Sequence, residues 1–414
     1  MQEEHPEARF IVETLVREGF VAYYAGGWVR DYLLKYPSDD IDIATNASPE
    51  AIQALFPKTV PIGIAFGIIL VLVGDKEFEV ATFRNDIEYK DGRRPTRIEF
   101  TTPEEDAKRR DFTINGMFYD PLQDKVIDHV EGKRDLEKKT IRAIGNPHQR
   151  IKEDRLRMIR AVRLSCRLGF SIEQETVDAI CAHAGELFPA VAMERIWQEF
   201  TKMAAYPGFG RALITLHDYG LLQTIFPAAR SLSLKELKER ARPLDDFPAD
   251  TPVIAYLLEL FPHASLEERL AMCKYLKLSK SEIQFVHFLC KAEALIQQKE
   301  VEKIEWAYFY ASPSASHSLH VFAARLQIHD RRPYWEEHEK RKLELQPAIL
   351  RIQQRTPVVT SNQLKELGVL PGVLMGKLLH EAERIAINEG IEDPHKVVEK
   401  LRHSPLWQQF KAEK

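Results

Sequence analysis

The spacing of hydrophobic residues changes near residue 145 of the chain. Before that point, short hydrophobic stretches alternate with polar residues, as in strands that are buried on one face. Short strands are predicted at 21–24 and 39–45, and a hairpin is predicted at 68–84 with its turn at 74–76. The first part of the chain therefore predicts a mixed α/β domain.

After about residue 146, hydrophobic residues recur at intervals of three and four, which is the period of an amphipathic helix. The predicted helical segments are 151–169, 173–187, 191–205, 208–222 and 264–300. Prolines separate them, and the longest connection is expected at 229–252. At about 150 residues per domain, the 414 residues are expected to form two or three domains. The pattern thus predicts an α/β head followed by an all-helical remainder.

The composition argues against several classes of protein. Lys and Arg number 58 and Asp and Glu 62, and this near-neutral balance does not fit a basic nucleic-acid coat or an acidic disordered tail. The four cysteines have no C-x-x-C spacing, which disfavours a cysteine zinc site or a disulfide framework and favours a reducing compartment. The N-terminus is acidic, unlike a secretory signal, and the longest apolar stretch, 60–74, is too short to span a membrane. We therefore expect a soluble, cytoplasmic protein.

The most informative local pattern lies at 39–45, where acids alternate with isoleucines. On a strand, Asp40 and Asp42 would point to one side while Ile41 and Ile43 enter the core. Two neighbouring carboxylates repel each other unless a cation lies between them, and oxygen ligands of this kind suit Mg²⁺. Such a pair could position two metal ions for the attack of a hydroxyl group on a phosphate. For the D-x-D pattern alone, an exposed edge strand with an acidic face is the better interpretation.

A glycine pair close to this strand favours the phosphate interpretation. Gly26 and Gly27 precede a predicted helix, and backbone N–H groups and the helix dipole favour a bound phosphate there. Arg30, one helical turn further on, could pair with a phosphate oxygen. Glu79, in the second strand of the predicted hairpin, is a candidate third metal ligand, whereas Glu77 on the same face is expected to be solvated. Together these residues predict a site for metal ions and the phosphates of a nucleotide.

Four motifs follow one another between residues 20 and 205. They are 26–31 (GGWVRD), 40–42 (DID), 109–115 (RRDFTIN) and 153–160 (EDRLRMIR). In this order and spacing they resemble the motifs of the class II tRNA nucleotidyltransferases, above all those that add CCA, and of their relatives the bacterial poly(A) polymerases. The resemblance implies an α+β fold: a polymerase-beta-type nucleotidyltransferase head with a mixed sheet and helices, followed by an all-helical neck, body and tail. The implied boundaries are 1–145 for the catalytic head, 146–207 for the neck, 208–312 for the body and 313–414 for a tRNA-binding tail.

The resemblance also implies roles for the first two motifs. Asp40 and Asp42 would be the catalytic metal ligands, which agrees with the argument from their alternation. Gly26, Gly27 and Arg30 would hold the triphosphate of the incoming nucleotide.

In the third motif, the resemblance implies that Asp111 accepts hydrogen bonds from the ribose hydroxyls. Arg110 and Asn115 would support the nucleotide and its pocket. The residue after Asn115 is Gly116, where relatives of this family mostly have alanine. This departure concerns only local packing.

The fourth motif has its own physical logic. Asp154 and Arg157 are three residues apart, so on a helix they share a face. A carboxylate and a guanidinium match the amine and ring nitrogen of cytosine and adenine, whereas uracil and guanine would leave unpaired buried groups. The resemblance assigns this base-selecting role to the pair; the alternative is an ordinary helix salt bridge. Arg160 and Glu153 are expected to be neck scaffold or phosphate contacts.

Three further segments resemble parts of the same family. Residues 89–95 look like the flexible loop that resets nucleotide choice from C to A, and residues 193–200 resemble a helix that braces the neck. Residues 360–379 are partly similar to an element near the end of many CCA-adding enzymes. The C-terminal residues 395–414 are only mildly basic, whereas the better-known bacterial poly(A) polymerases have an arginine-rich end.

The RNA partner is expected on a basic stretch. Between Lys133 and Arg167, twelve Lys and Arg residues stand against four acids, although the whole chain is negative. Such a stripe is typical of an RNA backbone contact, and the alternative is a solvated basic helix face.

The resemblance predicts a function: template-independent addition of CMP and AMP, from CTP and ATP, to the 3′ end of tRNA, with release of pyrophosphate and with Mg²⁺ as cofactor. The alternative within the family is a poly(A) polymerase or an A-adding tRNA nucleotidyltransferase. A catalytically silent RNA-binding protein is a third hypothesis. The presence of Asp40, Asp42 and Asp111 together argues against it.

Overall fold

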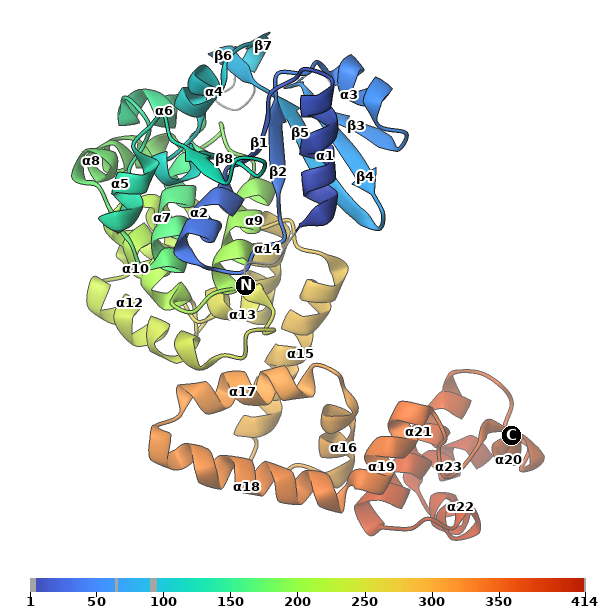
Figure 1. The fold of residues 1–414 in the computed structure, drawn as a ribbon. Coiled ribbons are helices and arrows are strands. Elements are labelled where there is room, and N and C mark those ends of the chain that lie inside the picture. The colour runs from blue at the N-terminus through green and yellow to red at the C-terminus, as the bar shows by residue number, and fades with distance from the viewer. Residues whose placement is uncertain (1–4, 64–65, 90–94, 413–414) are drawn as a thin grey trace. The chain divides into compact units, whose positions relative to one another are not determined.

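The computed structural model describes residues 5–63, 66–89 and 95–412 (Figure 1). The chain forms two compact units, Met1–Arg242 and Pro243–Lys414. The first contains a mixed sheet and helices, and the second is built of helices. This architecture confirms the predicted fold class. The four-part division into head, neck, body and tail is finer than these two units and stays a prediction.

A seven-stranded mixed sheet forms the centre of the first unit, in the order β3–β4–β5–β2–β1–β8–β9. Neighbouring strands are antiparallel except β2 and β5, which are parallel. Ile43, Val80 and Phe118 are fully buried on central strands, so an apolar centre fixes the polar residues at the strand ends. The strands are β1 (Ala22–Ala25), β2 (Asp42–Thr45), β3 (Thr59–Gly63), β4 (Ile68–Val73), β5 (Lys76–Thr82), β8 (Phe118–Asp120) and β9 (Lys125–Ile127).

The predicted hairpin at 68–84 is confirmed in β4 and β5, which pair antiparallel as far as Val73 and Lys76. Its turn consists of Gly74 and Asp75 and is one residue shorter than expected; Gly74 has a φ of +62°, which glycine adopts without strain. After β5, a second hairpin forms from β6 (Arg84–Tyr89) and β7 (Pro95–Phe100). The loop predicted at 89–95 joins these two strands, and its residues 90–94 lie outside the described residues.

The helices of the first unit flank the sheet and continue from it (Figure 1). A short parallel ladder of β10 (Thr140–Ile141) and β11 (Ser171–Ile172) lies among them. The helices are α1 (Pro6–Arg17), α2 (Gly27–Leu34), α3 (Pro49–Leu55), α4 (Pro103–Arg109), α5 (Gly132–Glu137), α6 (Pro147–Glu153), α7 (Leu156–Leu168), α8 (Gln174–His183), α9 (Met193–Ala204), α10 (Phe209–Asp218), α11 (Leu221–Ile225) and α12 (Leu234–Ala241).

Two predictions about this region were wrong. The single helix expected at 151–169 is interrupted between α6 and α7, because Asp154 has extended backbone angles and its carboxylate accepts from the N–H of Leu156. The long connection expected at 229–252 contains α12. Ser233 and Glu236 form a capping box at the start of this helix, a signal that the proline-rich composition had obscured.

The second unit is helical throughout its described residues. The segment predicted at 264–300 is divided at Ser279, which caps the second of its two helices. Of the helices that the structure describes, none is both long and apolar enough to cross a membrane. The helices are α13 (Val253–Leu258), α14 (Leu266–Tyr275), α15 (Lys280–Gln297), α16 (Lys303–Ala311), α17 (Ala315–Arg325), α18 (Ile328–Glu344), α19 (Gln346–Gln354), α20 (Ser361–Glu366), α21 (Val373–Glu389), α22 (Pro394–Arg402) and α23 (Pro405–Ala412).

Candidate active site

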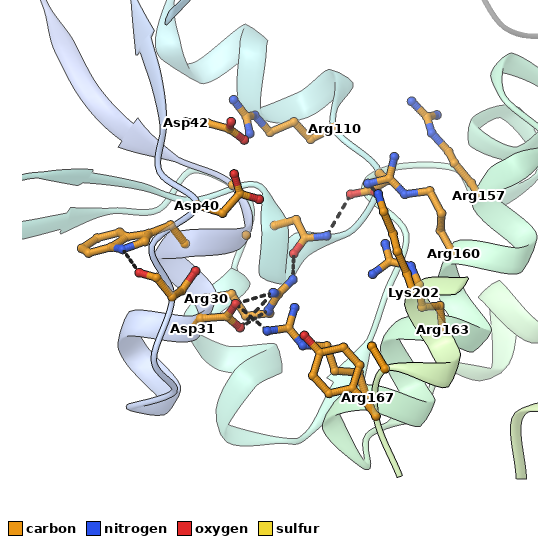
Figure 2. A pocket seen from close by; sticks show the side chains of 18 of the residues that line it. Arg30, Asp31, Asp40, Asp42, Arg110, Arg157, Arg160, Arg163, Arg167 and Lys202 are labelled. Atoms are coloured by element: carbon orange, nitrogen blue, oxygen red, sulfur yellow. Dashed lines mark hydrogen bonds and ion pairs between the residues drawn. The ribbon is translucent and has the colours of Figure 1, made fainter. Parts of the chain in front are cut away.

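A cavity of about 780 Å³ in the first unit brings the sequence motifs together (Figure 2). The strand ends and α2 form one side of it, and α7 and α9 contribute cationic side chains to the other. The predicted residues in its lining are Gly26, Gly27, Arg30, Asp40, Asp42, Arg110, Asp111, Asn115, Asp154, Arg157 and Arg160. Segments as far apart in the sequence as Gly26 and Arg160 thus meet at one site.

The two acids of the second motif both line the cavity, but they do not share one strand. The strand expected at 39–45 begins only at Asp42, and Asp40 lies in the irregular segment before β2. Ile41 and Ile43 are buried as predicted. Desolvation, and the nearby carboxylates of Asp40 and Glu79, raise the pKa of Asp42 to about 6. This concentration of negative charge fits a divalent cation, which would neutralise it.

Glu79, the third expected metal ligand, lies near Asp42 but outside the cavity lining. Glu79 lies on β5, which pairs parallel to β2 with Val80 opposite Ile43, so Glu79 is close enough to Asp42 to raise its pKa. Glu79 is not part of the cavity lining. Among the residues that the structure describes, no three His, Cys, Asp or Glu side chains converge as a group that could hold a metal. The role of Glu79 therefore stays a prediction.

The glycine turn lies directly against the acids. Gly26 joins β1 to α2 with a φ of +70°, and a Cβ atom there would lie 3.1 Å from Arg110 Nη1 and 3.8 Å from Asp42 Oδ2. A side chain would therefore crowd Arg110 and would be in van der Waals contact with Asp42. The guanidinium of Arg110 is also held by the Asp106 carboxylate, with Nε donating to Oδ2 over 3.1 Å. The turn, the acid and the cation form one compact group.

Arg30 is buried and engaged within the protein. Its Nε and Nη2 each donate to the Asp31 carboxylate over 2.9 Å, and Nη1 donates to Asn115 Oδ1 over 2.6 Å. Arg167 Nη2 also donates to Asp31, over 2.9 Å. Arg30 therefore lines the cavity beside the turn, fixed by Asp31 and Asn115, and its contact with a phosphate stays a prediction.

Asp111 is held as an anion beside these residues. Its Oδ1 accepts from the Phe112 backbone N–H over 2.8 Å and from Asn115 Nδ2 over 3.2 Å, and Arg160 Nη2 lies 2.6 Å from Oδ2. Burial alone would raise the pKa of this carboxyl group, but Arg160 and Arg157 together hold it below its usual range. Arg160 is thus an ion-pair partner of the residue expected to bind the ribose.

The proposed base-selecting pair is present in the cavity, although not as one helix face. Asp154 precedes α7. Arg195 of α9 donates to its carboxylate, from Nη1 to Oδ1 over 3.2 Å and from Nη2 to Oδ2 over 2.8 Å. Arg157, in the first turn of α7, donates to Glu153 over 2.9 Å and to the Arg150 carbonyl over 2.8 Å. The alternative, a salt bridge between Asp154 and Arg157, is not observed between these described residues: Asp154 pairs with Arg195, and Arg157 pairs with Glu153.

The cavity lining also contains residues that the sequence analysis did not assign to this site, among them Asp31, Arg163, Arg167, Lys202 and Tyr206. Arg163 and Arg167 belong to the basic stripe, and with Arg157 and Arg160 they recur on one side of α7 (Figure 2). That helical spacing was a usable signal that this part of the stripe faces a site. Lys202 and Tyr206 follow no motif.

Comparison with known proteins identifies the family. The "Poly A polymerase head domain" matches residues 22–142, and the "Probable RNA and SrmB- binding site of polymerase A" matches residues 169–232. The CCA-adding enzyme of Ligilactobacillus salivarius is 31% identical over 97% of this chain and 96% of its own. The chain belongs to the CCA-adding enzyme family.

Other members of the family support this assignment. The CCA-adding enzyme of Enterococcus faecalis is 46% identical, but the match spans only about half of each protein, 48% of this chain and 49% of that one. The crystal structure of the Bacillus stearothermophilus CCA-adding enzyme in complex with CTP gives a TM-score of 0.78 at 28% identity, covering 97% of this chain and 99% of that one. The resemblance drawn from the four motifs is confirmed. Membership of this nucleotidyltransferase family implies the use of a divalent metal ion.

Proposed function

We propose that the chain adds CMP and AMP, taken from CTP and ATP, to the 3′ end of tRNA without a nucleic-acid template. The observation that carries the proposal is the convergence in one cavity of the Asp40 and Asp42 carboxylates with the Asp154 and Arg157 side chains. The first pair suits phosphoryl chemistry and the second suits base recognition. The names of the relatives agree with this function, and no observation favours the alternative of poly(A) synthesis.

The chemistry is a substitution at the α-phosphorus of the nucleotide. The 3′-hydroxyl oxygen of the RNA forms the new bond, the bond to the bridging oxygen breaks, pyrophosphate leaves with the electron pair, and the hydroxyl proton passes to solvent. We propose Mg²⁺ as the cation that Asp40 and Asp42 would hold; when bound, it would stabilise the charge that develops on the phosphate oxygens. Arg110, beside Asp42, would neutralise further negative charge.

Base choice would depend on Asp154 and Arg157. The Asp154 carboxylate can accept from the exocyclic amine of cytosine or adenine, and Arg157 can donate to the neighbouring ring nitrogen. UTP and GTP present the reverse pattern, which would leave buried groups unpaired. Asp111 would accept from the ribose hydroxyls, supported by Asn115.

The remaining parts of the proposal concern the RNA. We propose that the acceptor end of tRNA reaches the cavity, and that the helical tail at 313–414 contacts the same molecule. The boundaries 1–145, 146–207 and 208–312 for head, neck and body belong to this proposal. Because the proposed substrate is tRNA, we also propose a cytoplasmic location.

A gel assay tests the function. Purified protein with Mg²⁺, CTP and ATP is given a tRNA that lacks its terminal CCA, and the expected product carries two C and one A and is not extended further. Asp42→Asn is the matched inactive control, because it keeps the size of the side chain and removes its charge. A long ladder of A on unrelated RNA, or no incorporation of C, would contradict the proposal.

A further inference from the structure

One end of the cavity is lined by cationic side chains that have no part in the reaction proposed above. Arg163 and Arg167 come from α7 and Lys202 from α9, and Figure 2 shows all three across the cavity from Asp40 and Asp42. Arg163 donates to Glu199 and Arg167 to Asp31. Lys202 lines the cavity and is exposed, and among the described residues no acidic side chain pairs with it. With Arg30 included, four cationic side chains at this end of the cavity stand against two acidic partners, Asp31 and Glu199.

Two contacts hold the side chain of Arg167 in one orientation. Its Nη2 donates to Asp31 Oδ2 over 2.9 Å, and its guanidinium lies over the ring of Tyr206, 4.8 Å from the centroid. Asp31 is buried and also holds Arg30. One buried carboxylate thus orients two guanidinium groups, one from the first turn of α2 and one from α7. Such preorganised cations recognise an anion at little cost in side-chain entropy.

The position of these cations relative to the glycine turn points to phosphate groups. A Cβ atom on Gly27 would lie 3.6 Å from Arg30 Nη2, so Arg30 is adjacent to the start of α2. Arg167 continues from Arg30 through Asp31, away from Asp40 and Asp42. A nucleotide whose α-phosphate lies at the two acids would extend its β- and γ-phosphates past the start of α2 toward this end.

We propose that Arg167 and Lys202 form an outer phosphate subsite, which binds the γ-phosphate of CTP or ATP and then holds pyrophosphate as it leaves. The inference rests on the proposed function and adds to it the residues that receive the leaving group. Arg167 offers a planar fork for two phosphate oxygens, and Lys202 offers a compact charge at the exit. Tyr206 is a positioning residue, since it supports the guanidinium of Arg167.

Calorimetric titration of CTP and of CMP, each with Mg²⁺ and without RNA, separates this subsite from the rest of the cavity. Arg167→Ala and Lys202→Ala are each expected to weaken CTP binding about tenfold, the usual effect of losing one charged hydrogen bond, and to leave CMP binding unchanged. In the transfer assay, inhibition by added pyrophosphate should weaken by a similar factor. Lys238→Ala, on the exposed face of α12, removes the same charge elsewhere and should change none of these values.

Three outcomes would overturn the subsite. A raised KM for tRNA with unchanged CTP affinity would show that these residues contact RNA instead. An equal loss of CTP and CMP affinity would show a structural role, and unchanged affinity for both would show no role. Lys202→Ala removes an exposed side chain, so it keeps the test valid if Arg167→Ala melts at a lower temperature. A wild-type protein that adds no C would contradict the proposed function, while the CTP and CMP titrations would still report on the subsite.

Discussion

Arg110 shows how closely the candidate site is packed at the scale of single residues. Its guanidinium lies against Gly26, lies over the ring of Phe118 at 5.1 Å, and is held from behind by the buried carboxylate of Asp106. Arg110 also opposes the rise in the pKa of Asp42 that desolvation and neighbouring acids produce. The position of this cation therefore depends on the residue at 26 having no side chain.

Gly26→Ala is expected to impair catalysis more than stability. With alanine, the positive φ of residue 26 should lower the unfolding free energy by about 1–3 kcal/mol. Its Cβ, 3.1 Å from Arg110 Nη1, would displace the guanidinium, and a shift of this kind should lower kcat on the order of 100-fold. Single-turnover rates and thermal melting measure the two effects. Gly19→Ala, also at positive φ but with open space around it, is the matched control and should keep its kcat.

In the proposed function, base selection would depend on the interruption between α6 and α7. Asp154 is not part of either helix, and its carboxylate is fixed by the two nitrogens of the Arg195 fork. Arg195 comes from the segment 193–200, which by resemblance was expected to brace the neck. Its contact with Asp154 orients a carboxylate that lines the cavity.

Arg195→Ala is expected to reduce the discrimination between CTP and UTP by about tenfold, because Asp154 could then rotate away from the exocyclic amine. Arg195→Lys should give an intermediate loss, since a lysine keeps the charge and lacks the fork. Competition between CTP and UTP in one transfer assay measures the ratio. Arg155→Ala removes an arginine next to Asp154 that pairs with Glu186 instead, and it should leave the ratio unchanged. Equal ratios in Arg195→Ala and wild type would refute this role.

Helix α18 gives the second unit a dependence on pH. His338 is buried on this helix, and its Nδ1 lies 2.7 Å from the hydroxyl oxygen of Tyr310. Burial, and then the nearby Arg341, lower the pKa of His338 to about 4, while Glu337 opposes this in part. The ordinary pKa of a histidine is 6.5. Between pH 6.5 and pH 4, the unfolded chain therefore binds a proton at His338 that the folded chain does not bind. Above pH 6.5, the titration of His338 therefore does not reduce the free energy of unfolding. As the pH falls from 6.5 toward 4, it lowers this free energy progressively.

Acidification from pH 7 to pH 5 should thus lower the unfolding free energy by about 2 kcal/mol through His338. His338→Gln has no titrating ring and keeps a hydrogen-bonding group near Tyr310, so its curve against pH should be flatter by that amount. Denaturant unfolding of both proteins at the two pH values gives the difference, in which the contributions of the other histidines cancel. Parallel curves for the two proteins would rule out the assignment.

Much of this arrangement could be predicted from local patterns, and the rest depended on contacts between distant segments. The alternation of Asp40 and Asp42 with isoleucines predicted their common exposure, because burial of Ile41 and Ile43 is a local consequence of side-chain hydrophobicity. The irregular backbone at Asp154 could not be predicted, since Arg195, forty-one residues away, helps to hold it. The periodicity of α7 indicated which arginines share a face and that this face meets a site, but not which distant residues lie across the cavity from it. Pairing of Arg30 with Asp31 was equally hidden, because neighbours in sequence on a helix do not usually face each other.

At the scale of the whole molecule, the net charge is −4, so the proposed attraction of tRNA would have to come from a local concentration of positive charge. Arg157, Arg160, Arg163 and Arg167 of the basic stripe line the cavity, so we propose that the exposed lysines of the stripe contact the RNA backbone. Binding of tRNA should therefore weaken steeply with salt, roughly 100-fold between 50 and 200 mM KCl if about four phosphates are contacted.

Lys138→Ala with Lys139→Ala should lower the slope of log affinity against log salt by about one for each lysine that contacts a phosphate. Lys235→Ala with Lys238→Ala on α12 removes the same charge from another exposed face, and filter binding across a salt series compares the two. Equal slopes in the two double variants would show that this part of the stripe is a solvated face rather than an RNA contact.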